Sequence, residues 1–438
     1  MIVSRSLLRF ATRRFNRIFG LLTSVVAALG VSTELAQVSH AQTTRNTINA
    51  VSCSPADVSN AVNAARAGDI VQVPAGTCIW PTSVGLSKNI WLKGAGPGAT
   101  VFKNNGSWEQ YYSKFMLYWN GPFEMSGITF DGNNAIGALS VAGTGTDLKI
   151  HDNVFTHARS RAFNGQGLIY GVVYQNTFVD NFIDVDSGGV EQAGWDAPFN
   201  YGDGNNLFVE DNVINHQSDT YRGQVYYTSY GGRMVFRHNA MTGFIDYDML
   251  DNHGNMGPDP RTRGFVGGEI YENTFTLSSG TYSSWRWIFH RGGQLMMFNN
   301  TVTAPSGWAG IELSEEDSWK TALGCPCPIR DNVANSHFWN NTFNGAAVSP
   351  TYNHPPEDPT VIIKGSNYWE PLSGLDASRP AACAPNTFFG ASDSDKLYRC
   401  GLTGTWQPLY QAYTYPHPLR DSAMVGTPAA PRNLRVVR

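Results

Sequence analysis

The chain of 438 residues has few charged side chains and, after its first residues, no long apolar segment. Asp, Glu, Lys and Arg make up 15% of the sequence and form no broad basic region, so nucleic acid is not an expected partner. No segment beyond residue 41 is apolar enough for a membrane-spanning helix. Glycine is abundant, with 45 residues, and 12% of the residues are aromatic. This composition is typical of a β-rich exported protein with many turns and surfaces for sugar stacking.

Residues 1–41 are interpreted as an export signal. A basic start with five arginines precedes an apolar core from Ile18 to Val31, and Ser39-His40-Ala41 fits a cleavage site. A membrane anchor is the alternative, although the apolar run is short for a spanning helix. Without this segment the chain has 26 basic and 34 acidic side chains and a net charge of −8. We therefore expect a secreted, cell-surface or periplasmic monomer with no membrane partner after signal removal.

The six cysteines suit an oxidising compartment. We expect disulfides between Cys53 and Cys78 and between Cys383 and Cys400. Cys325 and Cys327 are too close in sequence to bridge comfortably, and no His or Cys lies nearby at the spacing of a zinc site. These two are interpreted as free or unusually paired thiols in a loop.

An asparagine repeat sets the expected fold. Each of these asparagines follows an apolar residue by three positions, as Asn212 follows Val209, and precedes an apolar or small residue by two positions, as in Ile214. The eight asparagines are Asn133, Asn153, Asn176, Asn212, Asn239, Asn273, Asn300 and Asn341. Their spacings run from 20 to 41 residues, which indicates a solenoid with a fixed unit and variable insertions.

Each repeat has the pattern of strand, turn, strand. Alternating apolar residues such as Leu207 and Val209 have the period of a strand with one buried face. Asparagine tolerates the left-handed conformation of a sharp corner, and Phe155 and Phe178 are expected to point inward after it. Ordinary hairpins with Asn turns are the alternative.

On these residues, the chain resembles the right-handed parallel β-helix proteins of the pectin-lyase-like superfamily over roughly residues 50–345. The resemblance implies an all-β fold, a single-stranded right-handed parallel β-helix solenoid. Ser54, Pro55 and an apolar stripe predict a helix over residues 55–66, which in the resembled family caps the solenoid. Twelve of the 23 prolines lie between Pro350 and Pro431, so we expect an irregular C-terminal cap there.

The expected organisation has four parts. They are the signal (residues 1–41), the N-terminal cap and first coils (42–110), the β-helix (111–349), and a Pro-rich C-terminal cap and tail (350–438). Residues 187–206, 254–267 and 303–335 are interpreted as loops inserted between coils, and loops carry function on a rigid scaffold. In the resembled family such loops wall a substrate groove across one parallel sheet.

Four segments that precede glycine-rich turns are expected to stack as adjacent strands. They are residues 181–186, 226–230, 246–253 and 285–291. In this alignment Asn252 stacks on His290 and His253 stacks on Arg291, about 4.8 Å apart at the backbone. Such a mixture of imidazole, cation and carboxylate is typical of sites with shifted pKa values. An internal polar network that holds residues 254–267 is the alternative.

The resemblance implies an enzyme that cleaves a polysaccharide, and β-elimination is the favoured reaction. It requires a cation or metal on the uronate carboxylate and a base at carbon 5. The candidate catalytic residues are His253, His290, Arg291 and Asp251. The candidate substrate-binding residues are Arg261, Arg263, Arg286, Trp285 and Tyr227. Asp184, Asp186 and Asp248 are candidate ligands for Ca²⁺.

Two other functions are compatible with the same residues. A glycoside hydrolase would use two carboxyl groups, from these aspartates or from Glu269 with Asp251. A non-catalytic glycan-binding or adhesin-like β-helix is the third hypothesis. The aspartate arrangement of polygalacturonases and the basic pattern of characterised pectate lyases do not match this sequence residue by residue, which leaves the reaction open.

Overall fold

A computed structural model describes residues 45–105, 114–119, 121–217, 223–245, 248–255, 263–278, 286–316, 331–352 and 362–422. The predicted export signal, Cys325 and Cys327 lie outside these residues. Within them, no helix is long and apolar enough to cross a membrane.

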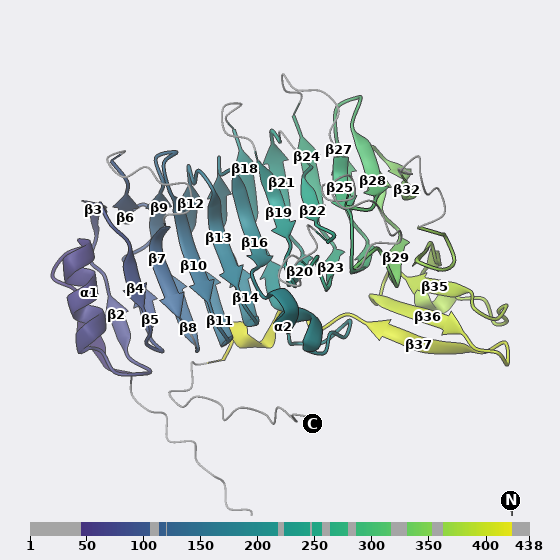
Figure 1. Cartoon of the computed structure of the whole chain (residues 1–438), viewed down its shortest axis with the longest axis horizontal. Helices are drawn as coiled ribbons and strands as arrows, with labels where there is room; N and C mark the ends of the chain where they lie inside the picture. Colours follow the sequence, from purple (N-terminus) through teal and green to yellow (C-terminus); the bar gives the residue numbers. More distant parts are fainter. Residues whose placement is uncertain are drawn as a thin grey trace, which may run out of the picture. The chain divides into compact units, whose positions relative to one another are not determined.

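Three long sheets run side by side along the described chain, and the successive coils from β2 to β28 contribute one strand to each of them (Figure 1). Sheet A has the order β1 (Thr47–Asn49), β2 (Ile70–Gln72), β5 (Trp91–Lys93), β8 (Phe123–Ser126), β11 (Gly145–His151), β14 (Ile169–Tyr174), β17 (Leu207–Glu210), β20 (Arg233–Arg237), β23 (Gly267–Tyr271), β26 (Gln294–Phe298), β29 (Ser336–Trp339) and β33 (Tyr368–Trp369). Sheet B has the order β3 (Gly76–Ile79), β6 (Thr100–Lys103), β9 (Thr129–Asp131), β12 (Val154–Thr156), β15 (Thr177–Val179), β18 (Val213–His216), β21 (Ala240–Gly243), β24 (Thr274–Leu277), β27 (Thr301–Thr303), β30 (Thr342–Phe343) and β31 (Ala346–Ala347). Sheet C has the order β4 (Val84–Leu86), β7 (Lys114–Trp119), β10 (Gly137–Ala142), β13 (Arg161–Gln166), β16 (Ile183–Gly188), β19 (Gln224–Thr228), β22 (Leu250–Asn252), β25 (Arg286–His290), β28 (Ala309–Leu313) and β32 (Thr351–Tyr352).

The pairing of these strands is parallel, except that β31 runs antiparallel to β30. Neighbouring strands in each sheet come from successive coils of the chain, so the chain forms the predicted right-handed parallel β-helix. Phe130, Phe155 and Phe178 stack inside it, with ring centroids 5.5 Å and 5.0 Å apart, and all three are fully buried. The predicted strand phase is therefore correct at these positions.

Seven of the eight repeat asparagines form one ladder at the corner between sheets A and B. The side-chain amide of each donates to the side-chain oxygen of the next, over 3.0 Å from Asn212 to Asn239 and 3.0 Å from Asn239 to Asn273. The same amides donate to backbone carbonyls such as that of Val209. The ladder members are Asn153, Asn176, Asn212, Asn239, Asn273, Asn300 and Asn341.

Two details of the asparagine prediction were wrong. Asn133 follows β9 and lies at the next corner, because Ile128 occupies the ladder position in that coil. The left-handed residue of the corner is also not the ladder asparagine but the residue before it, as in His238 with φ 54° and Glu272 with φ 57°. The asparagine is needed for its amide, which satisfies buried backbone groups that the corner leaves without strand partners.

The N-terminal helix α1 (Pro55–Ala64) confirms the helix expected at residues 55–66. The Ser54 side chain accepts from the backbone N–H of Asp57, and Val58 and Val62 are buried. At the other end, the Lys88 ammonium donates to the carbonyls of Val62 and Ala65, at 2.9 Å and 2.8 Å. A cation there complements the partial negative charge of the helix C-terminus. The helix lies at the end of the β-helix that holds the first strands, β1 and β2 (Figure 1).

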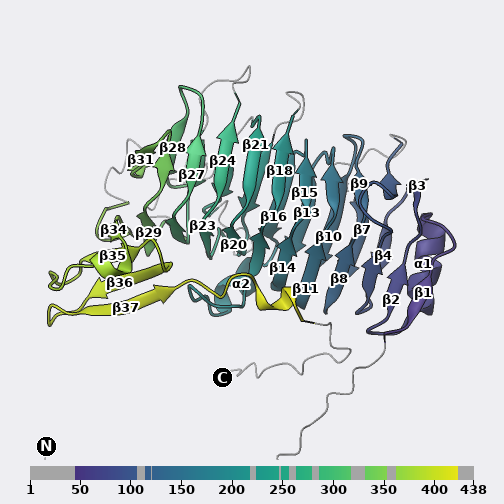
Figure 2. The ribbon, with the colours of Figure 1, turned by 180° about the vertical axis from the view of Figure 1, so that it is seen from behind.

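The C-terminal region is more regular than its proline content suggested. It forms a four-stranded sheet of β34 (Leu372–Gly374), β35 (Phe388–Ala391), β36 (Lys396–Cys400) and β37 (Trp406–Gln411), with the short 3₁₀ helices η2 (Asp376–Ser378) and η3 (Pro418–Arg420). Pro408 is tolerated because β37 is an edge strand, beside a register shift at Leu397/Tyr398. After β37 the chain passes helix α2 (Glu191–Asp196) and reaches β14 and β11 (Figure 2).

Both expected disulfides are present. The Cα atoms of Cys53 and Cys78 are 5.6 Å apart, and those of Cys383 and Cys400 are 5.9 Å apart.

Candidate functional site

A row of polar and aromatic side chains crosses the outward face of sheet C. The strand register places Asp186, Tyr227, Asp251, Phe289 and Glu312 opposite one another on β16, β19, β22, β25 and β28. Their neighbours in sequence, one position earlier, belong to the interior and are fully buried or nearly so. These are Val185, Tyr226, Leu250, Ile288 and Ile311. Because side chains alternate along a strand, the polar row faces outward.

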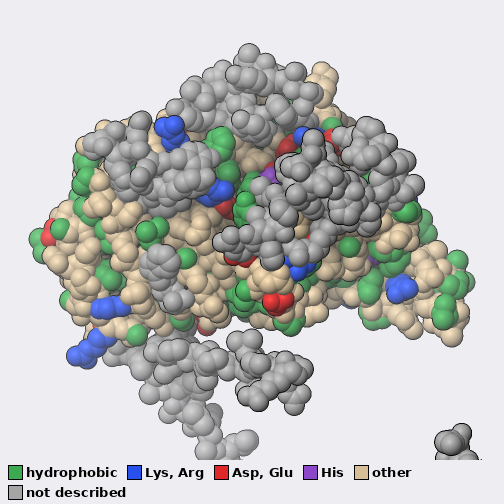
Figure 3. Space-filling model, in the orientation of Figure 1, with side chains coloured by type: hydrophobic (Ala, Val, Ile, Leu, Met, Phe, Trp, Pro, Cys, Tyr) green, Lys and Arg blue, Asp and Glu red, His purple; other side chains and the backbone are tan. Residues whose placement is uncertain are grey.

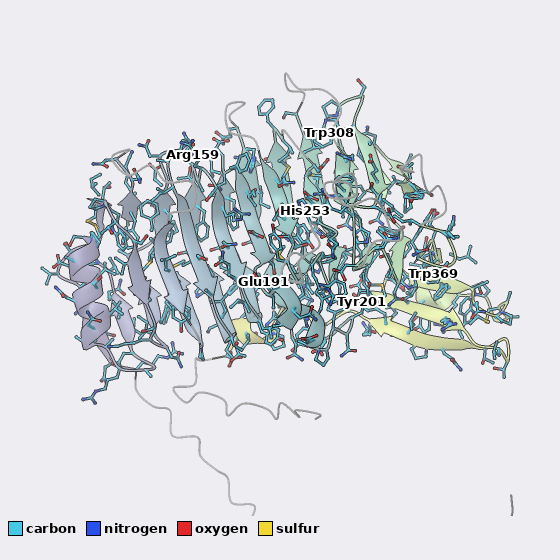
Figure 4. All side chains as sticks on the ribbon, in the orientation of Figure 1. Arg159, Glu191, Tyr201, His253, Trp308 and Trp369 are labelled. Carbon is cyan, nitrogen blue, oxygen red and sulfur yellow. A yellow bond between two sulfur atoms is a disulfide. The ribbon has the colours of Figure 1, made fainter. Side chains whose placement is uncertain are left out.

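His253 and Arg291 extend this row at the C-terminal ends of their strands, in the register that the sequence predicted. Asn252 pairs with His290, and the N–H of Arg291 donates to the carbonyl of Asn252. Figure 4 shows His253 in the middle of the face, and Figure 3 shows acidic, basic and histidine side chains gathered there.

A charged cluster lies on this face and consists of four side chains, those of Asp251, His253, Arg291 and Glu316. The guanidinium of Arg291 donates to both carboxylate oxygens of Asp251, at 2.9 Å each, and contacts Glu316 at 2.6 Å. His253 lies 3.1 Å from Asp251 through Nε2 and 3.1 Å from Glu316 through Nδ1. Gln224 donates a further hydrogen bond to Asp251 over 2.9 Å. The carboxylate of Asp251 is therefore held in place by three side chains, those of Arg291, His253 and Gln224.

The cluster shifts the pKa values of its members in opposite directions. Burial acts to raise the pKa of Asp251, but His253 and Arg291 outweigh it and lower that pKa well below its usual range. Burial, and less strongly Arg291, acts to lower the pKa of His253, but Asp251 and Glu316 raise it. Asp251 is thus ionised at any working pH, and the pKa of His253 is raised from its ordinary value.

A second carboxyl group, Asp248, lies beside this cluster in a different electrostatic environment. Burial and the charge of Asp251 raise the pKa of Asp248, although Arg286 opposes the shift. Arg286 donates to Asp248 at 2.6 Å and to Glu312 at 2.9 Å, and its guanidinium lies over the ring of Phe289, 3.6 Å from the centroid. Two neighbouring carboxyl groups therefore have pKa values that are moved apart.

Tyr227 lies between the two ends of the row. Its ring is half-buried, 4.8 Å from the imidazole of His253, and the guanidinium of Arg161 lies 5.5 Å from its centroid. Arg161 also forms an ion pair with Asp186. Burial raises the pKa of Tyr227, with smaller contributions from Asp251 and Asp186.

Asp331 connects two of the predicted insertions, residues 254–267 and 303–335, through hydrogen bonds. It accepts from the guanidinium of Arg263, from the backbone N–H of Gly264 at 3.2 Å and from Asn255 at 3.2 Å. Arg263 in turn lies over the ring of Trp195, 4.1 Å from the centroid. Arg263 therefore joins loops and does not reach the charged cluster among the described residues.

Several candidate residues lie away from the cluster. His290 is fully buried inside the β-helix. Asp184 is also fully buried and binds His216 over 2.8 Å. Glu269 lies on sheet A, where Tyr410 donates to it over 2.6 Å, so it cannot be paired with Asp251. Arg261 and Trp285 lie outside the described residues.

The candidate calcium ligands are not gathered at one place. Asp184 faces the interior, Asp186 binds Arg161, and Asp248 binds Arg286. Among the described side chains, no group of three or more His, Cys, Asp or Glu residues could hold a metal ion. A calcium site stays a prediction without a matching ligand set in this part of the chain.

Sequence reasoning missed Glu312, Glu316, Gln224 and Arg161. The first two were missed because residues 303–335 were interpreted as one insertion, whereas β28 within it is a fifth strand of the row. The alternation Ile311, Glu312, Leu313 is the signal that would have revealed this strand. Gln224 and Arg161 precede the predicted segments and carried no signal of their own.

No protein-family model and no curated protein matches this sequence. Among solved structures, it is similar to an alginate lyase from Paenibacillus sp. str. FPU-7, at 12% identity and a TM-score of 0.43 over 74% of this chain and 98% of that one. It is also similar to ORF18 of Geobacillus virus E2 (13% identity, TM-score 0.40, 84% of this chain and 86% of that one). A third is the family 28 exopolygalacturonase of Yersinia enterocolitica (10% identity, TM-score 0.33, 74% and 77%). The strand order of sheets A, B and C shows a parallel β-helix in this chain.

Proposed function

We propose that the protein is an exported glycoside hydrolase that cleaves a polysaccharide on the outward face of sheet C. The observation that supports this proposal is the pair Asp248 and Asp251, two neighbouring carboxyl groups with pKa values shifted in opposite directions. Glycoside hydrolysis requires an acid and a base whose pKa values differ in this way. The two disulfides are consistent with export.

Each carboxyl group has a defined task in this mechanism. Asp248, whose pKa is raised from its ordinary value, donates a proton to the glycosidic oxygen as the bond to the anomeric carbon breaks. Asp251 is ionised and either takes a proton from the attacking water or attacks the anomeric carbon itself. Arg291, His253 and Gln224 keep Asp251 ionised and fixed in orientation.

β-Elimination is the second candidate, and Tyr227 is the observation that favours it. Its hydroxyl is the titratable group between Asp186 and Asp251, and the guanidinium of Arg161 and the imidazole of His253 flank its ring. It could take the proton at carbon 5 of a uronate only as the phenolate, and the raised pKa of Tyr227 opposes that form. We rank this reaction second because Arg286 and Arg291, the arginines expected to neutralise that uronate, each bind two protein carboxylates.

A panel of neutral and uronate-containing polysaccharides tests the proposal. Reducing ends without ultraviolet absorbance from an unsaturated product indicate hydrolysis, and a rise in both indicates β-elimination. Asp248→Asn should lower kcat by about 100-fold or more, as expected for loss of a general acid. The matched control is Asp147→Asn, an exposed carboxylate on sheet A that should leave kcat unchanged. Full activity of Asp248→Asn contradicts the assignment, and no product from any polysaccharide favours a binding module.

A further inference from the structure

A chain of hydrogen bonds crosses the interior of the β-helix directly behind the charged cluster. The Thr228 hydroxyl donates to the Asn252 side-chain oxygen at 3.0 Å, and the Asn252 amide contacts His290 Nδ1 at 3.3 Å. His290 Nε2 contacts the Ser336 hydroxyl at 3.1 Å, and that hydroxyl donates to the Ala334 carbonyl at 3.0 Å. All four side chains of this chain are fully buried. It links sheet C to sheet A.

The donors and acceptors of this chain fit one protonation state of His290. A side-chain amide nitrogen can only donate, so His290 Nδ1 must accept from Asn252 and carries no proton. Nε2 then carries the proton and donates to Ser336. Burial lowers the pKa of His290 to about 3, so the ring is neutral. A charged imidazolium would place a second donor against the Asn252 amide.

Asn252 connects this interior chain to the outward cluster. It is the residue between Asp251 and His253, and side chains alternate between the two faces of a strand. A strand of only three residues, β22, carries it. A bond that fixes the Asn252 side chain from inside therefore fixes the backbone from which Asp251 and His253 project.

We propose that His290 is a positioning residue, which acts through Asn252 to hold Asp251 and His253 in the geometry of the site. The proposal rests on the proposed function for its consequence in catalysis, but its structural part can be tested without any substrate. The sequence made His290 a candidate base. The buried, neutral ring instead aligns groups that it does not touch.

The first test is the ionisation of the two imidazoles, measured by NMR at His290 and His253. The groups that face His253 are Asp251, Glu316, Arg291 and the ring of Tyr227. We expect His290 to be the Nε2–H tautomer at neutral pH. His290→Leu removes the acceptor for the Asn252 amide, so the pKa of His253 should fall toward its ordinary value as its ion pairs loosen. His290→Gln offers one acceptor and one donor and should restore the shift.

His337→Leu is the matched control. His337 is also buried, and burial lowers its pKa to about 3, but its ring lies against Trp369 and Phe388 on sheet A. This variant should leave the pKa of His253 unchanged. An Nδ1–H or charged His290 in the unaltered protein, or an unchanged His253 in folded His290→Leu, overturns the proposal. The tautomer decides the question even if His290→Leu does not fold.

The second test uses activity. His290→Leu should lower kcat at least tenfold with little change in KM and should shift the pH profile of kcat, and His290→Gln should recover most of the loss. Equal losses in His290→Leu and His290→Gln would overturn the proposal by leaving only a structural role. If no polysaccharide is cleaved, the proposed function fails, and the NMR experiment still judges the positioning role separately.

Discussion

The outward faces of sheets A and C both carry rows of charged side chains, but these charges differ in their burial and in their partners. On sheet A, Glu210 and Arg237 pair over 2.6 Å with both side chains fully buried. Arg237 also donates to the carbonyls of Tyr413 and Thr414 in the C-terminal segment. On sheet C, Arg291 and His253 each keep 12% of their side chains in contact with solvent, whereas Asp251 and Glu316 keep 4%.

The difference in burial indicates a separate role for each set of charges. A buried charge is tolerated only when hydrogen bonds replace the lost water, and the C-terminal segment supplies them on sheet A. Glu210 also accepts from the backbone N–H of His417, at 2.8 Å, and from Arg420 at 3.1 Å. The charges of sheet A therefore fasten the end of the chain to the β-helix. On sheet C, Arg291 and His253 keep part of their side chains exposed, at the face where we propose that the substrate binds.

Arg237→Ala should have the largest effect on stability. It leaves Glu210 buried without its principal partner and frees two carbonyls of the C-terminal segment, so we expect a loss of about 3–5 kcal/mol in the free energy of unfolding. Urea denaturation measures this loss. Lys103→Ala is the control, because the pair of Lys103 with Asp131 is 43% exposed at the lysine and should be worth less than about 1 kcal/mol. Similar losses for both variants would contradict the contrast between covered and hydrated charges.

The corner ladder offers a buried reference without charge. Asn239→Ala removes the partner of Asn212, of Asn273 and of the Val209 carbonyl, so we expect a loss of about 2–3 kcal/mol in the same measurement. Asn133→Ala, at a corner outside the ladder, should cost much less. If the two variants were equally stable, the ladder would not be the stabilising element.

Arg291→Ala tests the hydrated face directly. His253 still binds both Asp251 and Glu316 in this variant, so the loss of stability should be about 1–2 kcal/mol, below that of Arg237→Ala. Activity on the best polysaccharide should nevertheless disappear, because Asp251 loses the guanidinium that donates to both of its carboxylate oxygens. Thermal unfolding and kcat measured on one preparation separate the two effects. A variant that unfolds, or that keeps full activity, would remove Arg291 from the site.

The smallest effect concerns pH at the covered face. Burial and then the charge of Glu272 raise the pKa of Asp395 to about 6, although Asn299 donates to Asp395 and opposes the shift. The pKa is higher in the folded state, so the stabilising contribution is complete below about pH 4 and is lost as the pH rises through 6. Asp395→Asn should be more stable than the unaltered protein at pH 7 and less dependent on pH between 4 and 7.

The control for this prediction is Asp393→Asn, an exposed neighbour that should keep the pH dependence of the unaltered protein. Urea denaturation at a series of pH values provides the measurement. An unchanged slope in Asp395→Asn would assign the dependence to other groups.

The fold was predictable because its information is local and repeated. The Asn212 motif recurs in every coil of the ladder, and the alternation of strands such as β17 depends only on neighbouring residues. The helix α1 was predictable for the same reason, from its cap and its apolar stripe. The register of His253 on Arg291 followed from trailing glycines. Repetition lets weak local signals support one another.

The site was predictable only in part, because its contacts join residues far apart in sequence. The sequence placed His253, Arg291 and Asp251 on neighbouring strands by itself. It did not reveal Glu316, which closes the cluster from a segment that it assigned to an insertion. It also gave no means to separate His290 from His253, since both follow similar strands.

The sequence by itself determined the β-helix, the N-terminal helix, both disulfides and the neighbourhood of the charged cluster, because periodicity and glycine spacing are properties of the chain alone. The tertiary structure decided which side of the strand each polar residue occupies and what covers it. A shift of one position along a strand reverses the direction of a side chain. His290 and His253 thus have opposite pKa shifts, since one is buried in the interior beside uncharged side chains and the other lies between two carboxylates.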